Sequence, residues 1–485
     1  MFSRFIAGAI VSKIKFSAVT HFLASRHDLF AFHQNPGAFQ RLTPPWAPVK
    51  CLEHTGGIKD GARVLLEVEP IKLHWLMGHK DFVQDQQFVD YQVKGPFKSW
   101  HHEHLFTDAA DNNGILEDRL EIDLPAGMIA NRLMGPWLKG ELKRLFDYRH
   151  AITARDMRLK ARLGGAPLVV LVSGTNGLIG GALCALLSTQ GHRVLRLVRA
   201  DLDGNIDGAT ESQKADEDVE IIRWHPDSGT FFDPLPALDA VVHLAGRNIA
   251  SKYWTEKEKS RLYQSRVVPT VKLALKLASM APGDRPRVFF CASGISIYGD
   301  GKGKGPCGED SPASDDFLGN LAVDWEAACK PAADAGIRVI NGRFGVVLSP
   351  KSGALGKMLP AFEAGLGGPI GDGEQLMPWI SLDDAIAAIY QCIADREHEA
   401  ILNGPVNIVS PQIVSNGEFA KTLAHVLHRP CAIAAPEAVL KIALGEMAES
   451  LVLSSVHALP KKLKEAAFDF RDADLEGAMR FCMGR

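Results

Sequence analysis

The sequence predicts an α/β protein in which a doubly wound parallel sheet follows a smaller α+β domain. Three observations support this fold class. The chain has 485 residues, more than one hydrophobic core normally serves, so two domains are the first expectation. From residue 168 onward, short apolar runs alternate with helical stretches, which is typical of a parallel sheet covered on both faces. A glycine-rich string stands directly between the first of these runs and the next helical stretch.

Composition and charge are those of an ordinary globular protein, with 46% hydrophobic and 23% charged residues. The formal net charge of -3 gives no electrostatic reason to expect a nucleic acid or a membrane as partner. The cysteines contain no C-x-x-C pair, which argues against a zinc ribbon or redox pair and fits a reducing compartment. The apolar run Phe5–Val11 is too short to span a bilayer. We interpret this run as a strand or frayed start rather than a targeting signal, and expect a cytoplasmic protein.

Residues 1–155 are expected to form the α+β domain. Runs of alternating polarity between turn residues predict strands at Phe16–Ala24, Arg63–Glu69, Ile71–His79, Gln87–Val93, Trp100–Thr107 and Gly114–Asp123. A short helix is predicted over Arg26–Gln34, and a longer one over Arg132–His150. The longer helix has one apolar side, formed by Leu133, Trp137, Leu138, Leu142, Leu145 and Phe146. We expect a curved antiparallel sheet wrapped around this long helix.

Residues 167–485 are expected to form the parallel sheet. A linker is predicted at residues 156–166, where basic residues lead into Gly164-Gly165-Ala166-Pro167. The predicted strands that follow are Leu168–Ser173, Arg193–Val198, Ala240–Ala245, Arg287–Ala292 and Arg338–Arg343. Segments 345–380 and 400–460 are expected to build a smaller lobe on the substrate side.

The glycine-rich loop consists of Gly174, Thr175, Asn176, Gly177, Leu178, Ile179 and Gly180. A G-x-x-G-x-x-G string alone is a weak signal, but between a buried strand and a helix it is the Rossmann signature of dinucleotide binding. Gly174 allows the tight turn, Gly177 lets the backbone approach the pyrophosphate, and Gly180 lets the helix pack against the strand. The helix N-terminus then offers unpaired N–H groups to the phosphates.

The end of the second predicted strand bears on the choice of cofactor. NAD sites usually carry an acidic residue there, which binds the ribose 2′-hydroxyl. This strand ends instead with Val198 and Arg199, and a guanidinium can hold the 2′-phosphate of NADP bidentately. We therefore expect NADP(H). The alternatives are NAD, bound through nearby Asp201, and a solvent-facing Arg199 that holds no ligand.

Several later segments resemble a known family. They are Ala240–Gly246, Tyr253–Thr255, Asp324–Glu326, Arg343–Leu348, Gly365–Gly371 and Trp379–Asp384. These strings are similar to the atypical, epimerase-like branch of the extended short-chain dehydrogenase/reductases, also known as NAD-dependent epimerases or SulA-type proteins. The resemblance implies an NADP site lined by Val198, Arg199, Leu244, Ala245, Arg261, Arg266 and Val347. Gly246 lies at the same sheet edge, while a solvated helix face is the alternative for Arg261 and Arg266.

The first domain carries a second resemblance. Phe30–His33, Pro36–Phe39, Leu42–Trp46 and Trp100–His104 look like segments of the polyketide-cyclase-like, START-related helix-grip domains. Such domains enclose an apolar cavity between the sheet and the long helix. The resemblance therefore implies that the first domain binds an apolar small-molecule ligand.

The catalytic motif is the point at which the sequence departs from the superfamily. Its members use a Ser or Thr with a Tyr-x-x-x-Lys pair, in which the Tyr transfers a proton and the Lys lowers the pKa of the Tyr. The serine region is recognisable at Ser293 and Tyr298, our candidate catalytic residues. Counted back from Glu326, however, the Tyr and Lys positions fall on Leu318 and Ala322. We therefore expect the chain to lack the dyad.

Two functions follow from this departure. The first is an NADP-dependent oxidoreductase or epimerase that acts on a small-molecule substrate with another acid or base. The second is a non-catalytic sensor or scaffold that binds NADP(H) and a second ligand. The alternatives for the candidate residues are a strand-end hydroxyl for Ser293 and a packing tyrosine for Tyr298. The substrate and the formation of a homo-oligomer stay open.

Three further patterns have simpler interpretations. On a strand, His102 and His104 share one face, and two ligands do not complete a metal site, so we expect no metal. Gly301–Gly305 lacks the frame of a phosphate loop and is expected to be a surface loop. Asp383 and Asp384 precede a helical pattern and are expected to cap that helix.

Overall fold

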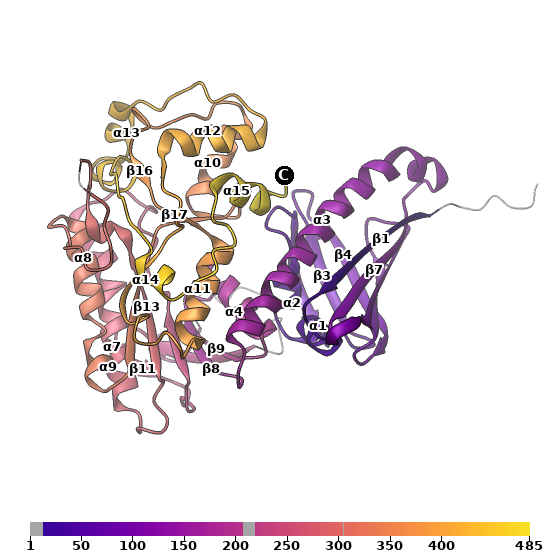
Figure 1. Cartoon of the computed structure of the whole chain (residues 1–485), viewed down its shortest axis with the longest axis horizontal. Helices are drawn as coiled ribbons and strands as arrows, with labels where there is room; N and C mark the ends of the chain where they lie inside the picture. Colours follow the sequence, from indigo (N-terminus) through magenta and orange to yellow (C-terminus); the bar gives the residue numbers. More distant parts are fainter. Residues whose placement is uncertain (1–12, 207–218, 304) are drawn as a thin grey trace, which may run out of the picture. The chain divides into compact units, whose positions relative to one another are not determined.

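The computed structural model describes residues 13–206, 219–303 and 305–485. The chain divides into two compact units (Figure 1), one formed mainly by residues up to Arg162 and one mainly by residues from Leu163 onward. Each unit contains its own large sheet. The apolar run Phe5–Val11 lies outside the described residues.

The first unit is a seven-stranded antiparallel sheet in the order β1-β7-β6-β5-β4-β3-β2. Its strands are β1 (Ile14–Phe22), β2 (Val49–Thr55), β3 (Arg63–Val68), β4 (Leu73–Val83), β5 (Gln87–Lys94), β6 (Ser99–Asp108) and β7 (Gly114–Asp123). Its helical segments are α1 (Arg26–Gln34), α2 (Ala38–Leu42), η1 (Ala110–Asn112) and α3 (Met128–Leu163). Leu120 and Ile122 of β7 pack with Leu142 and Phe146 of α3, so the long helix covers one face of the sheet (Figure 1).

Helix α3 extends beyond the predicted range at both ends. Residues 156–163 of the predicted linker are helical, and the buried Asp156 at the start of this stretch accepts hydrogen bonds of 2.7 and 2.9 Å from Arg41 of α2. At the other end, Leu133 and Trp137 are 76% and 61% exposed, although both belong to the predicted apolar side. In the described parts of the chain, no helix is both long and apolar enough to cross a membrane.

The second unit contains an eight-stranded sheet in the order β11-β10-β9-β8-β12-β13-β14-β18. Its strands are β8 (Val169–Ser173), β9 (Arg193–Arg199), β10 (Glu220–His225), β11 (Thr230–Phe231), β12 (Ala240–His243), β13 (Val288–Gly294), β14 (Arg338–Phe344) and β18 (Gly404–Ile408). All neighbours are parallel except β10 and the edge strand β11. This confirms the predicted α/β class. The strand order reverses between β8 and β12, and doubly wound sheets bind ligands at that point.

Helices and turns accompany this sheet: α4 (Leu178–Thr189), α6 (Glu256–Gln264), α7 (Val267–Ser279), η2 (Ile295–Tyr298), α8 (Phe317–Ala327), α9 (Lys330–Asp334) and α11 (Leu382–Ala394). Leu171, Leu195 and Phe289 of the sheet form a core with Leu273 and Leu277, which lie one turn apart on α7. Helix α11 is buried along most of its length, which accounts for its apolar sequence.

A smaller lobe is built from α10 (Gly353–Glu363), α12 (Asn416–Leu427), α13 (Glu437–Leu444), α14 (Lys461–Glu465), α15 (Leu475–Met483) and the π-helical turn η3 (Ala448–Val452). Two small sheets join them, β15 (Val346–Leu348) with β17 (Trp379–Ser381) and β16 (Leu376–Met377) with β19 (Val414–Ser415). Phe362, Trp379, Phe419 and Met479 share its core. Most of these elements fall in segments 345–380 and 400–460, but Gly404–Ile408 forms β18 of the eight-stranded sheet, and α14 and α15 lie beyond both segments.

Candidate nucleotide-binding site

The glycine-rich loop joins β8 to α4 at the carboxyl edge of the sheet. A Cβ on Gly174, whose φ is +73°, would lie 2.8 Å from the carbonyl carbon of Leu244. A Cβ on Gly180 would lie 2.2 Å from the carbonyl oxygen of Gly174. At Gly177 an added Cβ would meet only that same oxygen, at 3.1 Å. The first and third glycines therefore permit close packing, while the second leaves its backbone open to approach, as a pyrophosphate requires.

Two buried residues that were not predicted hold the ends of β8 and β12 together. The hydroxyl of Ser173 lies 2.6 Å from Nδ1 of His243 and accepts hydrogen bonds from the N–H groups of Leu244 and Ala245, at 3.2 and 3.4 Å. Burial lowers the pKa of His243 to about 4, so the ring is neutral at physiological pH. This contact sets the backbone of Leu244 and Ala245 beside the glycine-rich loop.

At the tip of β9, Val198 is buried and Arg199 is exposed. The guanidinium of Arg199 lies 3.5 Å from the carboxylate of Asp227, and both side chains are more than half exposed. Asp201 has a different role, because its Oδ1 accepts hydrogen bonds of 2.9 Å from the N–H groups of Asp203 and Asn205. These bonds to its own turn lower the pKa of Asp201. The exposed group at this strand end is therefore a guanidinium that lies beside the exposed carboxylate of Asp227.

Arg266 is buried beside Gly246, where an added Cβ would lie 3.5 Å from the guanidinium carbon. Its Nη2 donates to the carbonyl of Arg247 at 2.8 Å, and the guanidinium lies over the ring of Trp325. Burial lowers the pKa of Arg266 to about 10. Among the described residues, no carboxylate lies within ion-pair distance of Arg266. The alternative that Arg266 lies on a solvated helix face is therefore wrong.

The remaining predicted cofactor residues, Arg261 and Val347, lie on α6 and β15. Arg261 is on the exposed side of α6, with 48% of its side chain exposed, 3.6 Å from Glu258. Val347 is half-buried in β15, where it pairs with Ile380 of β17.

Ser293 and Tyr298 belong to one buried polar network. The hydroxyl of Ser293 donates to Glu326 at 2.7 Å, and Glu326 accepts two hydrogen bonds of 2.8 Å from Arg343. Tyr298 donates to the side chain of Asn407 at 2.7 Å and accepts from Arg343 at 2.9 Å. Both candidate hydroxyls are therefore hydrogen-bonded within the protein.

The charges of this network explain its pKa shifts. Burial raises the pKa of Tyr298, although Arg343 opposes the rise. Burial opposes the charge of Arg343, but the ion pair with Glu326 outweighs it and raises the pKa of Arg343. Glu326, Arg343 and Asn407 were not recognised from sequence as partners. The signal that could have indicated this network is Arg343, a charged residue within the buried strand β14.

The expected dyad positions, Leu318 and Ala322, are buried in α8. The Tyr-x-x-x-Lys spacing does occur at two other places in the sequence, Tyr253–Lys257 and Tyr298–Lys302. Neither pair lies on one helix: the first begins before α6, and Lys302 lies in the loop after η2 with 76% of its side chain exposed. In a dyad the two side chains lie one helical turn apart, which these pairs do not achieve.

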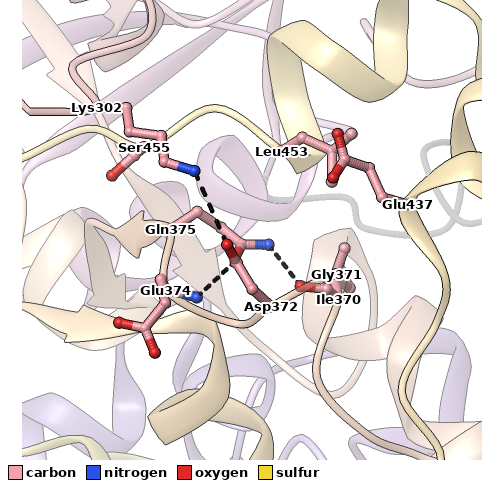
Figure 2. A pocket seen from close by; sticks show the side chains of 9 residues that line it. All are labelled: Lys302, Ile370, Gly371, Asp372, Glu374, Gln375, Glu437, Leu453 and Ser455. Carbon is pink, nitrogen blue, oxygen red and sulfur yellow. Dashed lines mark hydrogen bonds and ion pairs between the residues drawn. The ribbon is translucent and has the colours of Figure 1, made fainter.

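The smaller lobe contains a pocket of about 70 Å³. Figure 2 shows its lining, which includes Lys302, Asp372, Gln375 and Glu437. Lys302 lies 3.8 Å from Asp372, and the N–H of Gly301 donates to the carbonyl of Ser455 at 2.7 Å. The 301–305 loop is thereby joined to the lobe through its described residues. The pocket has room for a few water molecules rather than a sugar.

The predicted cap at Asp383-Asp384 is wrong. Ser381 caps α11, since its side chain accepts a hydrogen bond from the N–H of Asp384 at 3.0 Å. The Asp384 carboxylate accepts from the N–H groups of Arg471 and Asp472, at 3.2 and 3.0 Å. Burial, aided by the nearby charge of Asp472, raises the pKa of Asp384 to about 7.

Comparisons with known proteins agree with this site. Residues 170–408 match the NAD dependent epimerase/dehydratase family, and residues 435–482 match a domain of unknown function, DUF1731. An epimerase family protein of Mycobacterium bovis is 37% identical over 322 residues, which cover 66% of this chain and 99% of that protein.

Two solved structures are also similar. A nucleoside-diphosphate sugar epimerase from Corynebacterium glutamicum has a TM-score of 0.75 at 28% identity and covers 97% of this chain and 90% of its own. The human epimerase family protein SDR39U1, crystallised with NADPH, has a TM-score of 0.56 at 32% identity and covers 65% of this chain and 99% of its own. The chain belongs to the NAD dependent epimerase/dehydratase family.

Proposed function

We propose that this protein binds NADP(H) at the carboxyl edge of its parallel sheet and uses it in hydride transfer to or from a carbonyl or sugar-like substrate. The observation that carries the cofactor proposal is the contrast at the end of β9. Arg199 extends a guanidinium into solvent, whereas the carboxylate of Asp201 is engaged by its own turn. An exposed guanidinium suits a 2′-phosphate, which can replace its 3.5 Å contact with Asp227, and an engaged carboxylate is a poor partner for a 2′-hydroxyl.

The phosphate side of the site supports the same proposal. The backbone at Gly177 leaves room for a pyrophosphate to approach, and the N-terminus of α4 offers N–H groups to it. No described residue places a carboxylate within ion-pair distance of the buried Arg266, and a buried charge is costly unless it is paired. A phosphate beside Gly246 would provide that partner. The human relative crystallised with NADPH adds support.

The polar network bears on the chemistry. A bound nicotinamide cofactor supplies or accepts a hydride, and a carbonyl substrate also needs a proton. Ser293 donates to Glu326 and Tyr298 to Asn407, so each hydroxyl is engaged by an acceptor of the protein, and the proton for the carbonyl would come from solvent or from a group of the substrate. We therefore assign both residues a structural role. The second candidate function, a sensor that binds NADP(H) without turnover, is favoured by this same observation.

We also propose that the first unit is a helix-grip, START-related domain that binds a small-molecule ligand. The antiparallel sheet covered on one face by α3 supports this proposal.

A calorimetric titration with NADPH and NADH tests the cofactor proposal. We expect NADPH to bind more tightly, and Arg199→Ala to weaken NADPH binding about 10- to 100-fold, the worth of a charge-assisted bidentate contact. NADH binding should change little. Arg193→Ala is a matched control, because Arg193 begins the same strand and forms a surface pair with Glu220. Equal losses in the two variants, or equal affinity for both nucleotides, would contradict the proposal.

Turnover distinguishes the two functions. Purified protein that binds NADPH is incubated with a panel of carbonyl compounds and nucleotide sugars, and the loss of NADPH absorbance is followed. Ser293→Ala and Tyr298→Phe should retain turnover, provided that they fold. Tight binding with no turnover on any member of the panel would support the sensor.

A further inference from the structure

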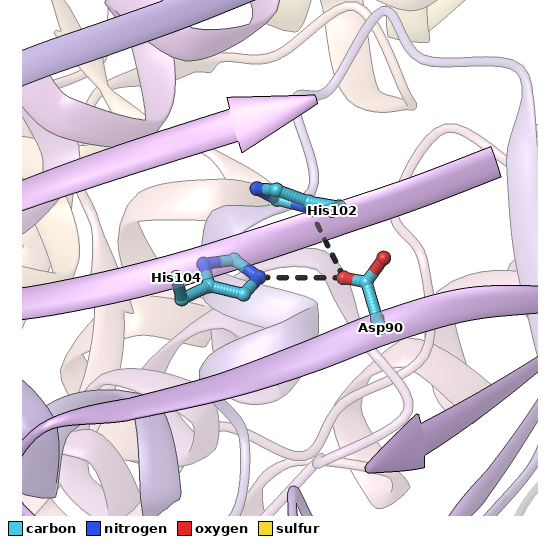
Figure 3. Close-up of side chains that lie close together, drawn as sticks. All are labelled: Asp90, His102 and His104. Atoms are coloured by element: carbon cyan, nitrogen blue, oxygen red, sulfur yellow. Dashed lines mark hydrogen bonds and ion pairs between the residues drawn. The ribbon is translucent and has the colours of Figure 1, made fainter. Parts of the chain in front are cut away.

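Four acidic and imidazole side chains gather on one face of the first unit's sheet. Asp90 of β5 pairs in register with His102 of β6, and Asp118 of β7 pairs with His104 of β6. His102 and His104 are two residues apart, so they point to the same face. Figure 3 shows one carboxylate oxygen of Asp90 facing both rings. The register thus adds a carboxylate on each side of the histidine pair.

The distances fit a shared ion. Oδ2 of Asp90 lies 3.1 Å from Nδ1 of His102 and 3.3 Å from Nε2 of His104 (Figure 3). One ligand atom from each of the three residues lies within 4.8 Å of the others. Ligand atoms that share one ion at about 2.1 Å are about 3.0 to 3.4 Å apart. Both oxygen–nitrogen distances fall in that interval.

The second nitrogen of each ring faces another carboxylate. Oδ1 of Asp118 lies 2.9 Å from Nε2 of His102 and 2.7 Å from Nδ1 of His104. The other oxygen of Asp118 lies 2.6 Å from Nε2 of His150 on α3. Metal-binding histidines nearly always direct their other ring nitrogen at a carboxylate, a carbonyl or a water, which fixes the ring orientation. Asp118 makes this hydrogen bond with His102 and lies close to Nδ1 of His104 without hydrogen-bond geometry.

The buried carboxylates of Asp90 and Asp118 also require a compensating positive charge. The side chains of His102, His104 and Asp118 are 2–3% exposed, and that of Asp90 is 19% exposed. Among the described residues, only imidazoles lie within ion-pair distance of Asp90 and Asp118. Two largely buried carboxylates need compensating positive charge. Either protons on the rings or one divalent ion would provide it.

We propose that Asp90, His102 and His104 bind a divalent transition-metal ion that accepts nitrogen and oxygen ligands, such as Zn²⁺ or Co²⁺. Two imidazoles and one carboxylate form a known ligand set for such ions and leave a coordination position for water or a ligand. Asp118 is a positioning residue that contacts both rings. We expected no metal from the sequence because His102 and His104 alone offer two ligands. Asp90, on the neighbouring strand, adds a third.

The test uses the full chain. The protein is stripped with a chelator, dialysed against Co²⁺ or Zn²⁺, and analysed for metal content and visible absorption. We expect on the order of one tightly held ion per chain, a cobalt absorption band and an increase in melting temperature on reloading. His102→Ala should lose all three. The control is His101→Ala, because His101 lies on the opposite face of the same strand, near Glu103.

Asp118→Asn separates positioning from ligation. We expect metal affinity to fall about 10- to 100-fold in this variant, with the cobalt band still present at high cobalt concentration. The proposal fails if stripped wild-type protein shows no cobalt band, whether or not the variants fold. It also fails if His101→Ala and His102→Ala lose metal equally. Protons on the two rings would then supply the compensating charge.

Discussion

The ion pair between Glu326 and Arg343 allows a quantitative prediction. Glu326→Ala removes the carboxylate that accepts two hydrogen bonds of 2.8 Å from Arg343 and one of 2.7 Å from Ser293. The side chains of Arg343 and Glu326 are 6% and 12% exposed. After the substitution, the guanidinium keeps Tyr298 and the carbonyl of Glu309 as acceptors but has no counter-charge.

Removing one partner of a buried ion pair costs about 3–5 kcal/mol, because the remaining charge stays desolvated. We expect a loss of this size in the free energy of unfolding of Glu326→Ala. Glu220→Ala is the matched control, since Glu220 and Arg193 form the same bidentate arrangement at 2.8 and 2.6 Å with about half of each side chain exposed. A surface pair of this kind contributes about 0–1 kcal/mol.

Urea titrations of both variants and the wild type measure the difference. The double variant Glu326→Ala/Arg343→Met should recover part of the loss, because it removes the unpaired charge. If Glu326→Ala destabilises the protein no more than Glu220→Ala does, the reasoning from burial is refuted. The reasoning is also refuted if the double variant is less stable than Glu326→Ala, because removing the unpaired charge should not destabilise the protein further.

Three further changes have defined outcomes. Gly180→Ala places a Cβ 2.2 Å from the carbonyl oxygen of Gly174, so we expect this variant to lose NADPH binding in a calorimetric titration. Gly165→Ala, which has nothing within 4 Å of its Cβ, should bind NADPH as the wild type does. Ser173→Ala leaves His243 without its 2.6 Å partner, and we expect a loss of about 1–3 kcal/mol in urea titrations; an unchanged midpoint would contradict this. The pKa of Asp384 is raised to about 7, so the folded state holds a proton that the unfolded state releases, and stability should fall as pH rises from about 4 to about 7. Asp384→Asn should flatten this part of the pH profile of melting temperature, and an unchanged slope would exclude Asp384 as its cause.

Local patterns predicted much of the fold. The predicted bounds of Arg26–Gln34 and Gly114–Asp123 agree with the structure, and the glycine-rich loop lies where the strand–loop–helix pattern puts it. Short β18 was missed because Gly404 and Pro405 within it favour turns over strands. Leu133 and Trp137 follow the helical period yet are exposed, since periodicity cannot tell where the covering sheet ends.

The site was less predictable because it depends on tertiary contacts. Glu326 and Arg343 meet only when α8 lies against the end of β14, and no local pattern pairs them. The alternation of side chains along β6 correctly placed His102 and His104 on one face. Asp90 lies beside them only because β5 pairs with β6 in the register that sets Asp90 opposite His102. Sequence reasoning named Ser293 and Tyr298 as candidate catalytic residues without identifying their hydrogen-bond partners, which lie 33 and 109 residues away.

The network around Arg343 also joins segments that are far apart in the chain. Asn407 of β18 donates through its side chain to the carbonyl of Leu459 at 2.9 Å, and its N–H donates to Glu309 at 3.2 Å. Because these bonds share members with the Tyr298 and Arg343 contacts, opening any one segment exposes polar groups of the others. The amide protons of β13, β14 and β18 should therefore exchange with solvent in a single cooperative event, as one foldon.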